Sequence, residues 1–589
     1  MRVNIQNHPV DFIDTGKKYE VNFRYHAGVK DEIKSTFEGA TWNVEKKKWT
    51  INKSYRNDIQ LAFYSGQNPF KIYTQPVKDF KTKRNLLPHQ QELVNAILTY
   101  RRLIGGYEMG LGKSLIFIES AELSGYDNVL YVGPKSGIAS VKRELIKWGV
   151  EIPVEFMTYE KMTKTVNNKD IEIPDYVFFD ESSKLKTYTS ARSKAGRVLV
   201  KEMIKRNPNC IVFLGTGTPA PKSPTDWYSQ CEVVCEGFVK EANTKKFEER
   251  LSVQERFEFE EGKPFNKIKF WLDNENKCKF CGRTKDLIHE GHAFTTSVNE
   301  VAKLYNRLKG LVWVKFKKDC LNLPSKIYEQ IDIKPTTEML KNVKALKAVA
   351  TMATQLASQM MQISDGFLYV DKVIGQKTCV VCYGSKVGIN PVTKLEDACD
   401  GCLGSGTQDV IQRTTMELST PKDESLVEQL EEHEEIGRLV VWCGFQTTID
   451  RVTKLVLKEG WHVLQWDGRG QVGYAPDGSE VLVDSLLKAL DKSNPEYQDT
   501  YEKVCFIGNA GSGGMGLTLT ASPTAVYYSN SNSGEARMQS EDRIHRIGIS
   551  VSPKIVDFLC LPIDRLVLKS LKQKKDLQSL TMGDILEVC

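Results

Sequence analysis

The sequence predicts an α/β protein with two doubly wound lobes, each built on a mainly parallel sheet, after a small N-terminal α+β domain. Three observations lead to this prediction. Short apolar runs typical of strands buried on both faces recur in two regions, helical patterns lie between them, and glycine-rich or acidic turns follow several of them. With 589 residues, 41% hydrophobic and 26% charged, the chain is long enough for roughly three to five structural units.

The predicted strands fall into two sets, one in each half of the chain. The first set contains Val129–Val132, Tyr176–Phe179 and Ile211–Leu214. The second set contains Leu439–Cys443, Val463–Trp466 and Val504–Ile507. We therefore expect two α/β halves joined by other elements.

A glycine loop precedes a lysine and a hydroxyl in the segment 107–114, Tyr-Glu-Met-Gly-Leu-Gly-Lys-Ser. In a phosphate-binding loop, backbone N–H groups and the start of the next helix surround the phosphates, the lysine reaches the outer ones, and the hydroxyl holds Mg²⁺. The match rests on Gly110, Gly112, Lys113 and Ser114, because Tyr107 stands where the pattern has its first glycine. A plain tight turn is the alternative, but the apolar run after Ser114 favours a buried helix and a nucleotide triphosphate site.

Two acidic residues follow the predicted strand at 176–179. Asp180 and Glu181 would lie at the carboxyl end of a parallel strand, where open α/β sheets bind ligands. Mg²⁺ prefers oxygen ligands, so we expect Asp180 to support the metal directly or through water and Glu181 to activate the attacking water. A solvated acidic pair is the alternative for these two residues taken alone.

The order of these motifs resembles the Swi/Snf family of superfamily two helicase-like ATPases over residues 86–559. That resemblance implies two RecA-like lobes that close on ATP and Mg²⁺ and track along duplex DNA. Gln90 matches the family's adenine-reading glutamine, and Asp180-Glu181-Ser182-Ser183 departs from the family where a histidine is usual at Ser183. Further similar segments in the first half are 158–160, 216–219, 311–315 and 323–326.

The second half continues the resemblance with segments 467–468, 513–519 and 539–548. It implies that Gly516 contributes to the nucleotide site and that Arg543 and Arg546 act as arginine fingers. Arg543 and Arg546 are three apart, so on a helix they would share a face. Segment 511–516 also fits the dinucleotide pattern G-x-G-x-x-G, but an oxidoreductase would leave the first-half motifs and both arginines without a role.

Cysteines form one cluster at the spacing of a structural Zn²⁺ site. Cys379-x2-Cys382 and Cys399-x2-Cys402 are separated by 16 residues rich in Gly, Pro and polar side chains. Four protein ligands leave no open position, so we expect a structural role. Unliganded, reduced cysteines are the alternative.

A second cluster combines Cys278-x2-Cys281 with His289-x2-His292. The seven-residue gap is shorter than in a zinc finger, and the two histidines are equally typical of a surface. The opening also looks like that of HNH nuclease domains, although no catalytic His/Asn set follows before Leu311. Structural Zn²⁺ is the interpretation that we prefer.

Residues 1–85 carry the basic excess, with 16 Lys and Arg against 9 Asp and Glu. Their alternating pattern predicts a small α+β domain with a β-hairpin between Trp42 and Trp49. The segment 37–49 weakly resembles the HARP module of annealing helicases, which binds branched DNA. The tryptophans and Lys46–Lys48 would then contact DNA, or else form the core of this domain.

These observations define six expected segments. They are 1–80 as a basic domain that contacts DNA, 81–235 as lobe 1, 236–330 as a helical insertion with the mixed cysteine and histidine cluster, 331–371 as a helical linker, 372–412 as the four-cysteine insertion, and 413–589 as lobe 2.

We expect a monomeric DNA-dependent ATPase that translocates on duplex DNA and remodels forks or branched DNA in repair or recombination. A strand-separating helicase, the motor of a restriction or defence complex, and a binding scaffold with an inactive ATP site are the alternatives. No segment resembles a signal peptide and no stretch reaches 18 apolar residues, so we expect a cytoplasmic protein without membrane contact, in a nucleoid or a host cell.

Overall fold

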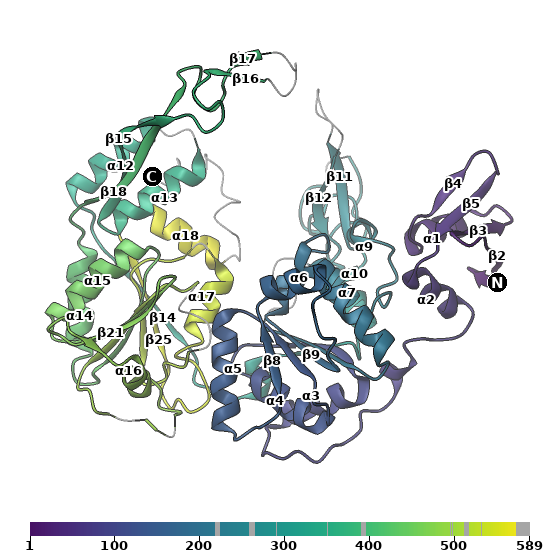
Figure 1. Cartoon of the computed structure of the whole chain (residues 1–589), viewed down its shortest axis with the longest axis horizontal. Coiled ribbons are helices and arrows are strands. Elements are labelled where there is room, and N and C mark those ends of the chain that lie inside the picture. The colour runs from purple at the N-terminus through teal and green to yellow at the C-terminus, as the bar shows by residue number, and fades with distance from the viewer. Residues whose placement is uncertain are drawn as a thin grey trace. The chain divides into compact units, whose positions relative to one another are not determined.

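The computed structural model divides into two compact units, Met1–Asn322 and Leu323–Cys589. It describes residues 1–217, 224–257, 265–289, 291–349, 352–389, 396–494, 496–497, 499–511, 517–531 and 533–572. Unit 1 carries an N-terminal domain and a parallel sheet, and unit 2 carries a second, larger sheet (Figure 1). The predicted fold class, two doubly wound α/β lobes with an α+β domain before them, is confirmed.

The N-terminal domain is a five-stranded antiparallel sheet with two helices packed on it. Val10, Phe12, Ile33 and Phe37 are among the fully buried side chains of its core. The predicted hairpin is present, with Trp42 opposite Trp49. In sheet order the strands are β1 (Arg2–Ile5), β2 (His8–Asp14), β3 (Lys18–Phe23), β5 (Lys48–Asn52) and β4 (Thr41–Asn43), and the helices are α1 (Ala27–Thr36) and α2 (Tyr55–Tyr64).

A buried arginine attaches this domain to the rest of unit 1. Arg56 on α2 is 0% exposed, pairs with Glu232 at 2.5 Å, and donates to the backbone oxygens of Val239 and Glu241 at 2.5 Å each. Because a charge this deep is costly to leave without its partners, these contacts tie the N-terminal domain to the rest of unit 1.

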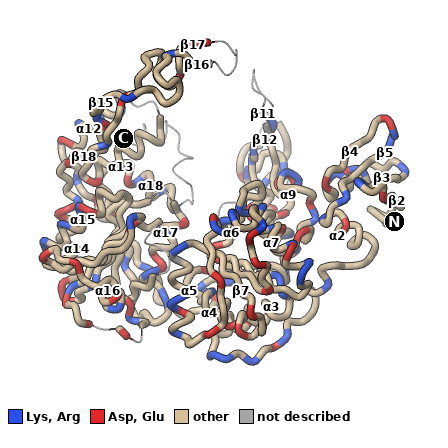
Figure 2. Tube along the Cα trace, in the orientation of Figure 1, with Lys and Arg blue, Asp and Glu red and all other residues tan. Residues whose placement is uncertain are grey.

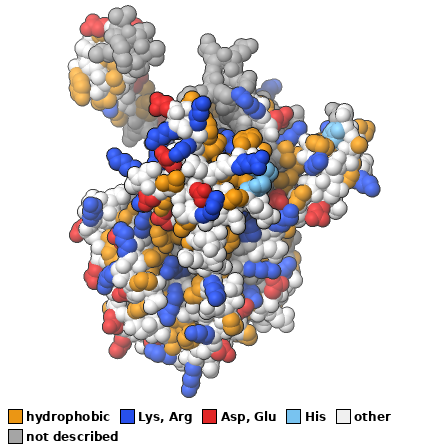
Figure 3. All heavy atoms as spheres, turned by 90° about the vertical axis from the view of Figure 1, so that its right-hand side faces the viewer, with side chains coloured by type: hydrophobic (Ala, Val, Ile, Leu, Met, Phe, Trp, Pro, Cys, Tyr) orange, Lys and Arg blue, Asp and Glu red, His pale blue; other side chains and the backbone are white. Residues whose placement is uncertain are grey.

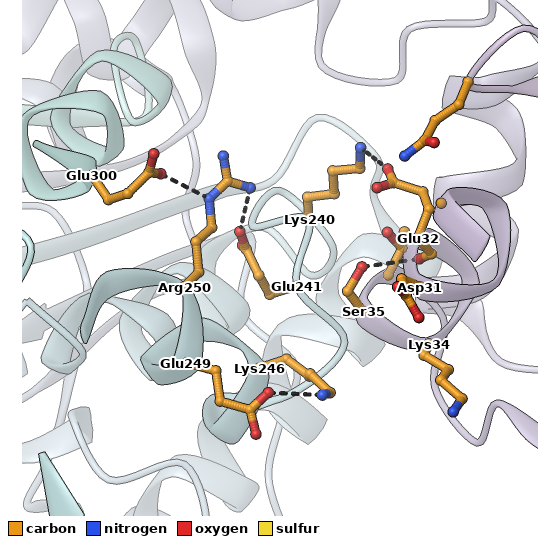
Figure 4. Close-up of a pocket in the computed structure, with 13 residues that line it drawn as sticks. Asp31, Glu32, Lys34, Ser35, Lys240, Glu241, Lys246, Glu249, Arg250 and Glu300 are labelled. Atoms are coloured by element: carbon orange, nitrogen blue, oxygen red, sulfur yellow. Dashed lines mark hydrogen bonds and ion pairs between the residues drawn. The ribbon is translucent and has the colours of Figure 1, made fainter. Parts of the chain in front are cut away.

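Beside this attachment lies a cavity of about 580 Å³ with charged walls (Figure 4). Arg250 bridges Glu241 and Glu300 on one side, at 2.8 and 3.2 Å. Lys240 pairs with Glu32 of α1 on the other side. The Lys240–Glu32 pair joins the N-terminal domain to the rest of unit 1, whereas the pairs of Arg250 lie within one wall of the cavity.

The sheet of unit 1 has six parallel strands with apolar residues on both faces. Tyr176 and Phe178 of β9 enter one core with α3, α4 and α5, while Val177 and Phe179 enter the other with α6, α7 and α8. This arrangement is the doubly wound pattern that long apolar strands predict. In sheet order the strands are β13 (Val312–Lys315), β6 (Arg102–Tyr107), β10 (Ile211–Thr216), β9 (Tyr176–Asp180), β7 (Val129–Val132) and β8 (Val154–Met157).

The helices of this part of unit 1 alternate with the strands along the chain. They are α3 (Pro88–Tyr100), α4 (Lys113–Ser124), α5 (Lys135–Lys147), α6 (Tyr159–Asn167), α7 (Ala191–Arg206) and α8 (Asp226–Val234), with the short helices η1 (Lys71–Thr74) and η2 (Ser182–Leu185). Helices η1 and α3 precede the first strand, β6.

An insertion lies between α8 and β13. It contains α9 (Thr244–Leu251), the antiparallel pair β11 (Ser252–Phe257) and β12 (Phe265–Trp271), the Cys/His segment and α10 (Glu300–Arg307). The chain then returns to the sheet as β13 and continues in α11 (Lys317–Cys320). The expected insertion 236–330 thus contains a strand of this sheet and the boundary between the units at 322 and 323.

Unit 2 contains an eight-stranded sheet, parallel from its first strand to its sixth. Leu439 and Val441 of β19 face one core, and Val440 and Trp442 face the other. In sheet order the strands are β14 (Ile327–Asp332), β25 (Lys554–Leu559), β24 (Thr524–Tyr527), β19 (Arg438–Trp442), β23 (Val504–Gly508), β20 (His462–Asp467) and the antiparallel β21 (Gly470–Tyr474) and β22 (Glu480–Val481).

Seven helices accompany this sheet in the described part of unit 2. They are α12 (Thr337–Val349), α13 (Ala353–Ser364), α14 (Lys422–Glu432), α15 (Gln446–Lys458), α16 (Val483–Leu490), α17 (Gly534–Glu541) and α18 (Pro562–Lys572). Met339, Leu356 and Met360 are buried in the core of unit 2. Helices α12 and α13, which fall in the expected linker 331–371, are therefore integral to this unit.

A two-stranded ribbon carries the cysteine-rich insertion of unit 2. Strands β15 (Phe367–Thr378) and β18 (Thr407–Glu417) pair antiparallel along their length, and the small pair β16 (Val387–Ile389) and β17 (Glu396–Ala398) lies beyond them (Figure 1). Most side chains of the ribbon are exposed, so packing against a core does not hold its outer end.

Charged side chains of both signs are interspersed along the trace (Figure 2). Basic groups are likewise scattered over the face seen in Figure 3, among acidic and apolar ones. Within the described ranges, no helix combines the length and apolar character that crossing a membrane requires.

The buried ion pair of the N-terminal domain gives a test of its attachment. In Arg56→Met, Glu232 would stay buried without its partner, which costs about 3–5 kcal/mol. Burial raises the pKa of Glu232 and Arg56 opposes this rise, so without Arg56 the carboxyl takes up a proton more readily and the deficit shrinks as the pH falls. Chemical unfolding across a pH series measures both effects.

The matched control is Arg2→Met, because Arg2 pairs with Asp11 on the surface of the same domain, with 70% of its side chain exposed. It should change stability by less than about 1 kcal/mol. Equal losses in the two variants would show that Arg56 does not anchor the domain.

Candidate nucleotide and metal sites

The loop between β6 and α4 has the backbone of a phosphate cradle. Gly110 and Gly112 have φ of 81° and 80°, in the left-handed region that glycine adopts without strain. A Cβ atom on Gly112 would lie 2.3 Å from Nε2 of Gln90. The loop therefore requires glycine at position 112 and leaves its backbone open to a close ligand.

Gln90 lies next to this loop, at the start of α3. Its Nε2 donates to the backbone oxygen of Leu111 at 3.2 Å, and its Oε1 accepts from the N–H of Leu87 at 3.0 Å. His89 contacts the same oxygen of Leu111 through Nε2 at 3.2 Å. The residue expected to read adenine is thus held against the phosphate loop.

Lys113 begins α4 and bends back toward the preceding strand. Its Nζ donates to the backbone oxygen of Tyr107 at 2.7 Å. Tyr107 is the last residue of β6, and its side chain is fully buried. Tyr107 stands where the motif has its first glycine. This position belongs to β6, and the loop starts at the next residue. Ser114 is the second residue of α4, beside the lysine.

Asp180 ends β9 inside the same edge of the sheet. Its Oδ2 accepts from the hydroxyl of Tyr131 at 2.5 Å, and its Oδ1 accepts from the N–H of Glu181 at 3.0 Å. Burial raises the pKa of Asp180, while Tyr131 and the nearby Lys113 ammonium oppose the rise. Lys113 and Asp180, 67 positions apart in the chain, are thus electrostatic neighbours.

Glu181 has an unusual backbone. Its φ is 51° and ψ is 51°, a left-handed conformation that is strained for a residue with a Cβ atom, at the start of η2. Such strain persists where surrounding contacts impose it and is typical of functional sites. The contacts here include the hydroxyl of Tyr159, which donates to the backbone oxygen of Asp180 at 2.8 Å.

The residues after Glu181 are buried serines. Ser182 donates to Oε1 of Gln230 on α8 at 2.8 Å, and Ser183 is 5% exposed. Ser183 occupies the position where the resembled family has histidine, and a larger side chain would need more room. Thr216 ends β10 nearby and is fully buried, whereas Thr218 and Pro219 lie outside the described residues.

Arg543 and Arg546 do not lie on a helix, contrary to expectation. Helix α17 ends at Glu541, and Arg543 follows in a turn and Arg546 in a bend. Even so, their guanidinium groups reach adjacent residues: Arg543 donates to the backbone oxygen of Leu517 at 3.1 Å, and Arg546 donates to Oγ1 of Thr518 at 2.5 Å. Gly516, the residue just before these two partners, is outside the described part of the chain.

The structure brings the four cysteines of the ribbon together. The sulfurs of Cys379, Cys382, Cys399 and Cys402 all lie within 4.8 Å of one another and form the only buried cluster found in this insertion among the described residues. Although burial opposes it, hydrogen bonds from Cys402 and backbone N–H groups lower the pKa of Cys382 to about 6, while burial and the other three thiols raise that of Cys399 to about 11. A thiolate is the form that binds Zn²⁺, so the donor set suits this ion.

The second cluster assembles as well, in the insertion of unit 1. Cys278, Cys281, His289 and His292 offer ligand atoms within 4.8 Å of one another. Sγ of Cys281 is 3.2 Å from Nδ1 of His289, and Sγ of Cys278 is 3.4 Å from Nε2 of His292. Two thiols and two imidazoles are a donor set that fits tetrahedral Zn²⁺.

Tyr131 and Tyr159 were missed as site residues by the sequence analysis. Both hold Asp180, and both are buried tyrosines whose pKa is raised well above its usual value by burial and by Asp180. Tyr159 lies in segment 158–160, which the sequence analysis named as similar to the family, and Tyr131 lies near the end of a predicted strand, but neither contact with Asp180 was predicted.

The tryptophans of the N-terminal hairpin differ in exposure. Trp42 is 48% exposed, whereas Trp49 packs partly against the domain core and under Lys34, 5.1 Å from its ring. Lys46 and Lys48 both pair with Glu20, at 2.9 and 3.1 Å. Of the expected aromatic DNA contacts, Trp42 is the more accessible.

Two known proteins are similar to this chain, one in sequence and one in structure. No protein-family model matches the chain. Over 90 residues the chain is 29% identical to the chromatin-remodeling ATPase INO80 of Candida albicans, covering 15% of this chain and 6% of that protein. The chain therefore spans a small part of that relative's length.

Among solved structures, the SWI2/SNF2 ATPase core of Sulfolobus solfataricus in complex with dsDNA is similar over 87% of this chain and 97% of its own. The sequence identity is 16% and the TM-score is 0.32. The relation to Swi/Snf-type ATPases stays what the motifs predict.

The glycine at position 112 can be tested against a glycine at the other end of the same helix. Gly112→Ala and Gly125→Ala both place a Cβ at positive φ, which costs about 1–2 kcal/mol, but only the first meets another side chain, that of Gln90. We expect a larger loss of thermal stability in Gly112→Ala, because its Cβ displaces Gln90, and a loss of ATP-analogue affinity of about tenfold or more in Gly112→Ala alone. Equal affinities in a fluorescence titration would contradict the cradle.

Metal analysis tests both clusters. We expect two equivalents of Zn²⁺ in the wild type and one in either Cys402→Ser or Cys281→Ser, because each site loses one of four ligands. Cys320→Ser, outside both clusters, should retain both equivalents. A single equivalent in the wild type, removed by Cys402→Ser, would show that the mixed cysteine and histidine cluster holds no zinc.

Proposed function

We propose that this protein is a DNA-dependent ATPase that couples ATP hydrolysis to translocation on duplex DNA. The observation that carries the proposal is the meeting of the glycine loop, Lys113 and the Asp180–Glu181 pair at one edge of a parallel sheet. A dinucleotide enzyme or a simple scaffold has no need of that combination.

Each residue at this edge has a task in hydrolysis. The N–H groups of the loop and of the first turn of α4 receive phosphate oxygens, and Lys113 exchanges the Tyr107 oxygen for a phosphate. Ser114 and Asp180 would hold Mg²⁺, which neutralises charge on the phosphates when bound. Burial raises the pKa of Asp180, and a cation beside it favours the ionised form.

Glu181 is the group that we assign to the attacking water. Its left-handed backbone directs the carboxylate independently of Asp180, although the two residues are consecutive. A carboxylate in this position can accept the proton of the water as the water attacks the terminal phosphate. Tyr131 and Tyr159 fix Asp180 and so fix the start of Glu181.

Arg543 and Arg546 complete the site from unit 2 in this proposal. Phosphoryl transfer spreads negative charge over the terminal phosphate oxygens, and arginine is the side chain best suited to receive it. Arg543 contacts Leu517 and Arg546 contacts Thr518, so two adjacent residues hold the two guanidinium groups.

The DNA part of the proposal rests on the motif series and on charge. Translocation on a duplex uses phosphates rather than base edges, and the face seen in Figure 3 offers basic groups to phosphates among acidic and apolar ones. Exposed Trp42 and the ribbon of unit 2 are suited to contact forked or branched DNA, which we propose as the preferred substrate.

Hydrolysis assays test this proposal directly. We expect ATP turnover that rises with DNA and falls to background in Lys113→Ala and Glu181→Gln, with Glu181→Gln retaining nucleotide binding. Turnover should be compared on duplex, single-stranded and forked DNA and on RNA. Absence of turnover with every nucleic acid would favour a scaffold, and strand displacement without triplex displacement would favour a strand-separating helicase.

The two arginines give a separate quantitative test. Arg546→Ala should lower kcat by about 10³–10⁵-fold at nearly unchanged ATP affinity, because it acts on charge that develops during transfer. Arg469→Ala is the control, since Arg469 pairs with Asp450 and Asp467 of the same unit. Equal kcat in wild type and Arg546→Ala would exclude the arginine-finger role.

A further inference from the structure

The segment that joins the two units is bonded at one end to the phosphate loop. Glu108, the first residue after β6, donates its N–H to the oxygen of Lys315 at 3.0 Å. Its carboxylate accepts the N–H of Lys317, at the start of α11, at 2.7 Å. Both bonds attach the last elements of unit 1 to the loop that carries Gly110 and Gly112.

The other end of the segment is bonded to the arginine region of unit 2. Lys326 immediately precedes β14 and pairs with Glu541 at 2.9 Å and with Asp542 at 3.4 Å, the two residues before Arg543. The hydroxyl of Tyr328 donates to Glu541 at 2.9 Å. Nε2 of His545, between the two arginines, lies 2.9 Å from the oxygen of Pro324.

These contacts of Lys326 are largely shielded from water. The Lys326 side chain is 18% exposed, and those of Glu541 and Asp542 are 8% exposed. Although burial works against the charge, Glu541 and Asp542 raise the pKa of Lys326. A lysine paired in this way holds its partners in place more firmly than a surface ion pair does.

Glu541 also belongs to a hydrogen-bond network with Arg537 and Asp557. Arg537 donates to Glu541 at 2.7 Å and to both oxygens of Asp557 on β25, at 2.5 and 3.0 Å. Strand β14 pairs with β25 in register. The arginine region is thus fastened to the edge of the sheet that the connecting segment enters.

The segment between the two anchors is short. Lys326 follows Lys317 by nine positions, so the two anchors can never be farther apart than about 30 Å. The Glu108 contact and the Lys326 contacts are thus joined by a short stretch of chain.

We propose that Lys326 and Tyr328 are positioning residues for Arg543 and Arg546, and that segment 317–326, anchored at Glu108, couples the phosphate loop to them. This inference rests on the proposed ATPase function. ATP bound at the loop would act on Glu108, and the connecting segment would set the orientation of the arginine region. Neither Lys326 nor Glu108 needs to touch the reacting phosphate for this role.

Steady-state kinetics of Lys326→Met test the positioning role. We expect kcat to fall about 10- to 100-fold with little change in the KM for ATP, because misplacement of a catalytic group by about 1 Å costs this much. Lys326→Arg should recover most of the rate, and Tyr328→Phe, which removes one hydroxyl, should cause a smaller loss of kcat.

The control is Lys554→Met. Lys554 starts β25 and pairs with Glu329 of β14 and with Glu432, at 2.8 and 3.3 Å, so it resembles Lys326 in sheet position but has no contact with the arginine region. It should keep kcat and lose less thermal stability than Lys326→Met, because its partners are 43% and 53% exposed. If Lys326→Met and Tyr328→Phe keep the kcat of an active wild type, or if Lys554→Met loses as much kcat, the positioning role is wrong.

A double-mutant cycle tests the coupling along the segment. Glu108→Met, which removes the acceptor of the Lys317 N–H, and Lys326→Met should each lower kcat, and their combination should lower it by less than the product of the two effects, since both interrupt one connection. Independent, multiplicative effects would overturn the coupling. An inactive wild type would instead contradict the proposed function itself.

Discussion

The common register of three parallel strands is the constraint on which the candidate site depends. Gly215 of β10 lies opposite both Gly105 of β6 and Asp180 of β9. Because these strands reach the sheet edge together, the loop after β6 and the acidic end of β9 lie on either side of β10. A shift of one residue in β9 would turn Asp180 to the opposite face of the sheet. Glycine at 215 also leaves space, since a Cβ there would lie 2.6 Å from the ring of Phe178.

The same edge of the sheet contains a buried carboxyl group and unusual backbone conformations, both of which cost free energy. Asp180 is a buried carboxyl, Glu181 has a left-handed backbone, and the loop before Lys113 contains two glycines with positive φ. The phenylalanine rings of the central strands stack behind this edge, with Phe178 4.7 Å from Phe213. Tight packing behind the site allows a strained arrangement to persist in front of it.

The accessory parts are held by a few local interactions rather than by large cores. Arg56 anchors the N-terminal domain, and four sulfurs form the buried centre of the ribbon insertion. The connecting segment is fastened by Glu108 at one end and by Lys326 at the other. Each of these parts can therefore be altered by one substitution while the sheets stay intact, which makes their roles separable by experiment.

Local patterns in the sequence were sufficient to predict the strands of both sheets and to name the residue types of the candidate site. Apolar runs such as Tyr176–Phe179 and Val504–Ile507 form buried strands as predicted, because burial on both faces requires such runs. The hairpin at Trp42 and Trp49 and the closeness of the four ribbon cysteines also followed from spacing. The roles of the nucleotide-site residues stay predictions until they are tested.

Where the predictions failed or were silent, long-range packing decided the outcome. Arg543 and Arg546 were expected on one helical face, but α17 ends before them and their contacts with Leu517 and Thr518 replace that face. Tyr131, Glu108 and Lys326 acquire their partners from segments 49, 209 and 215 residues distant. Periodicity and spacing describe neighbours along the chain, so the sequence by itself determined which elements form. Only the tertiary structure decided which of their polar groups meet, because burial makes each such group find a partner wherever the fold places one.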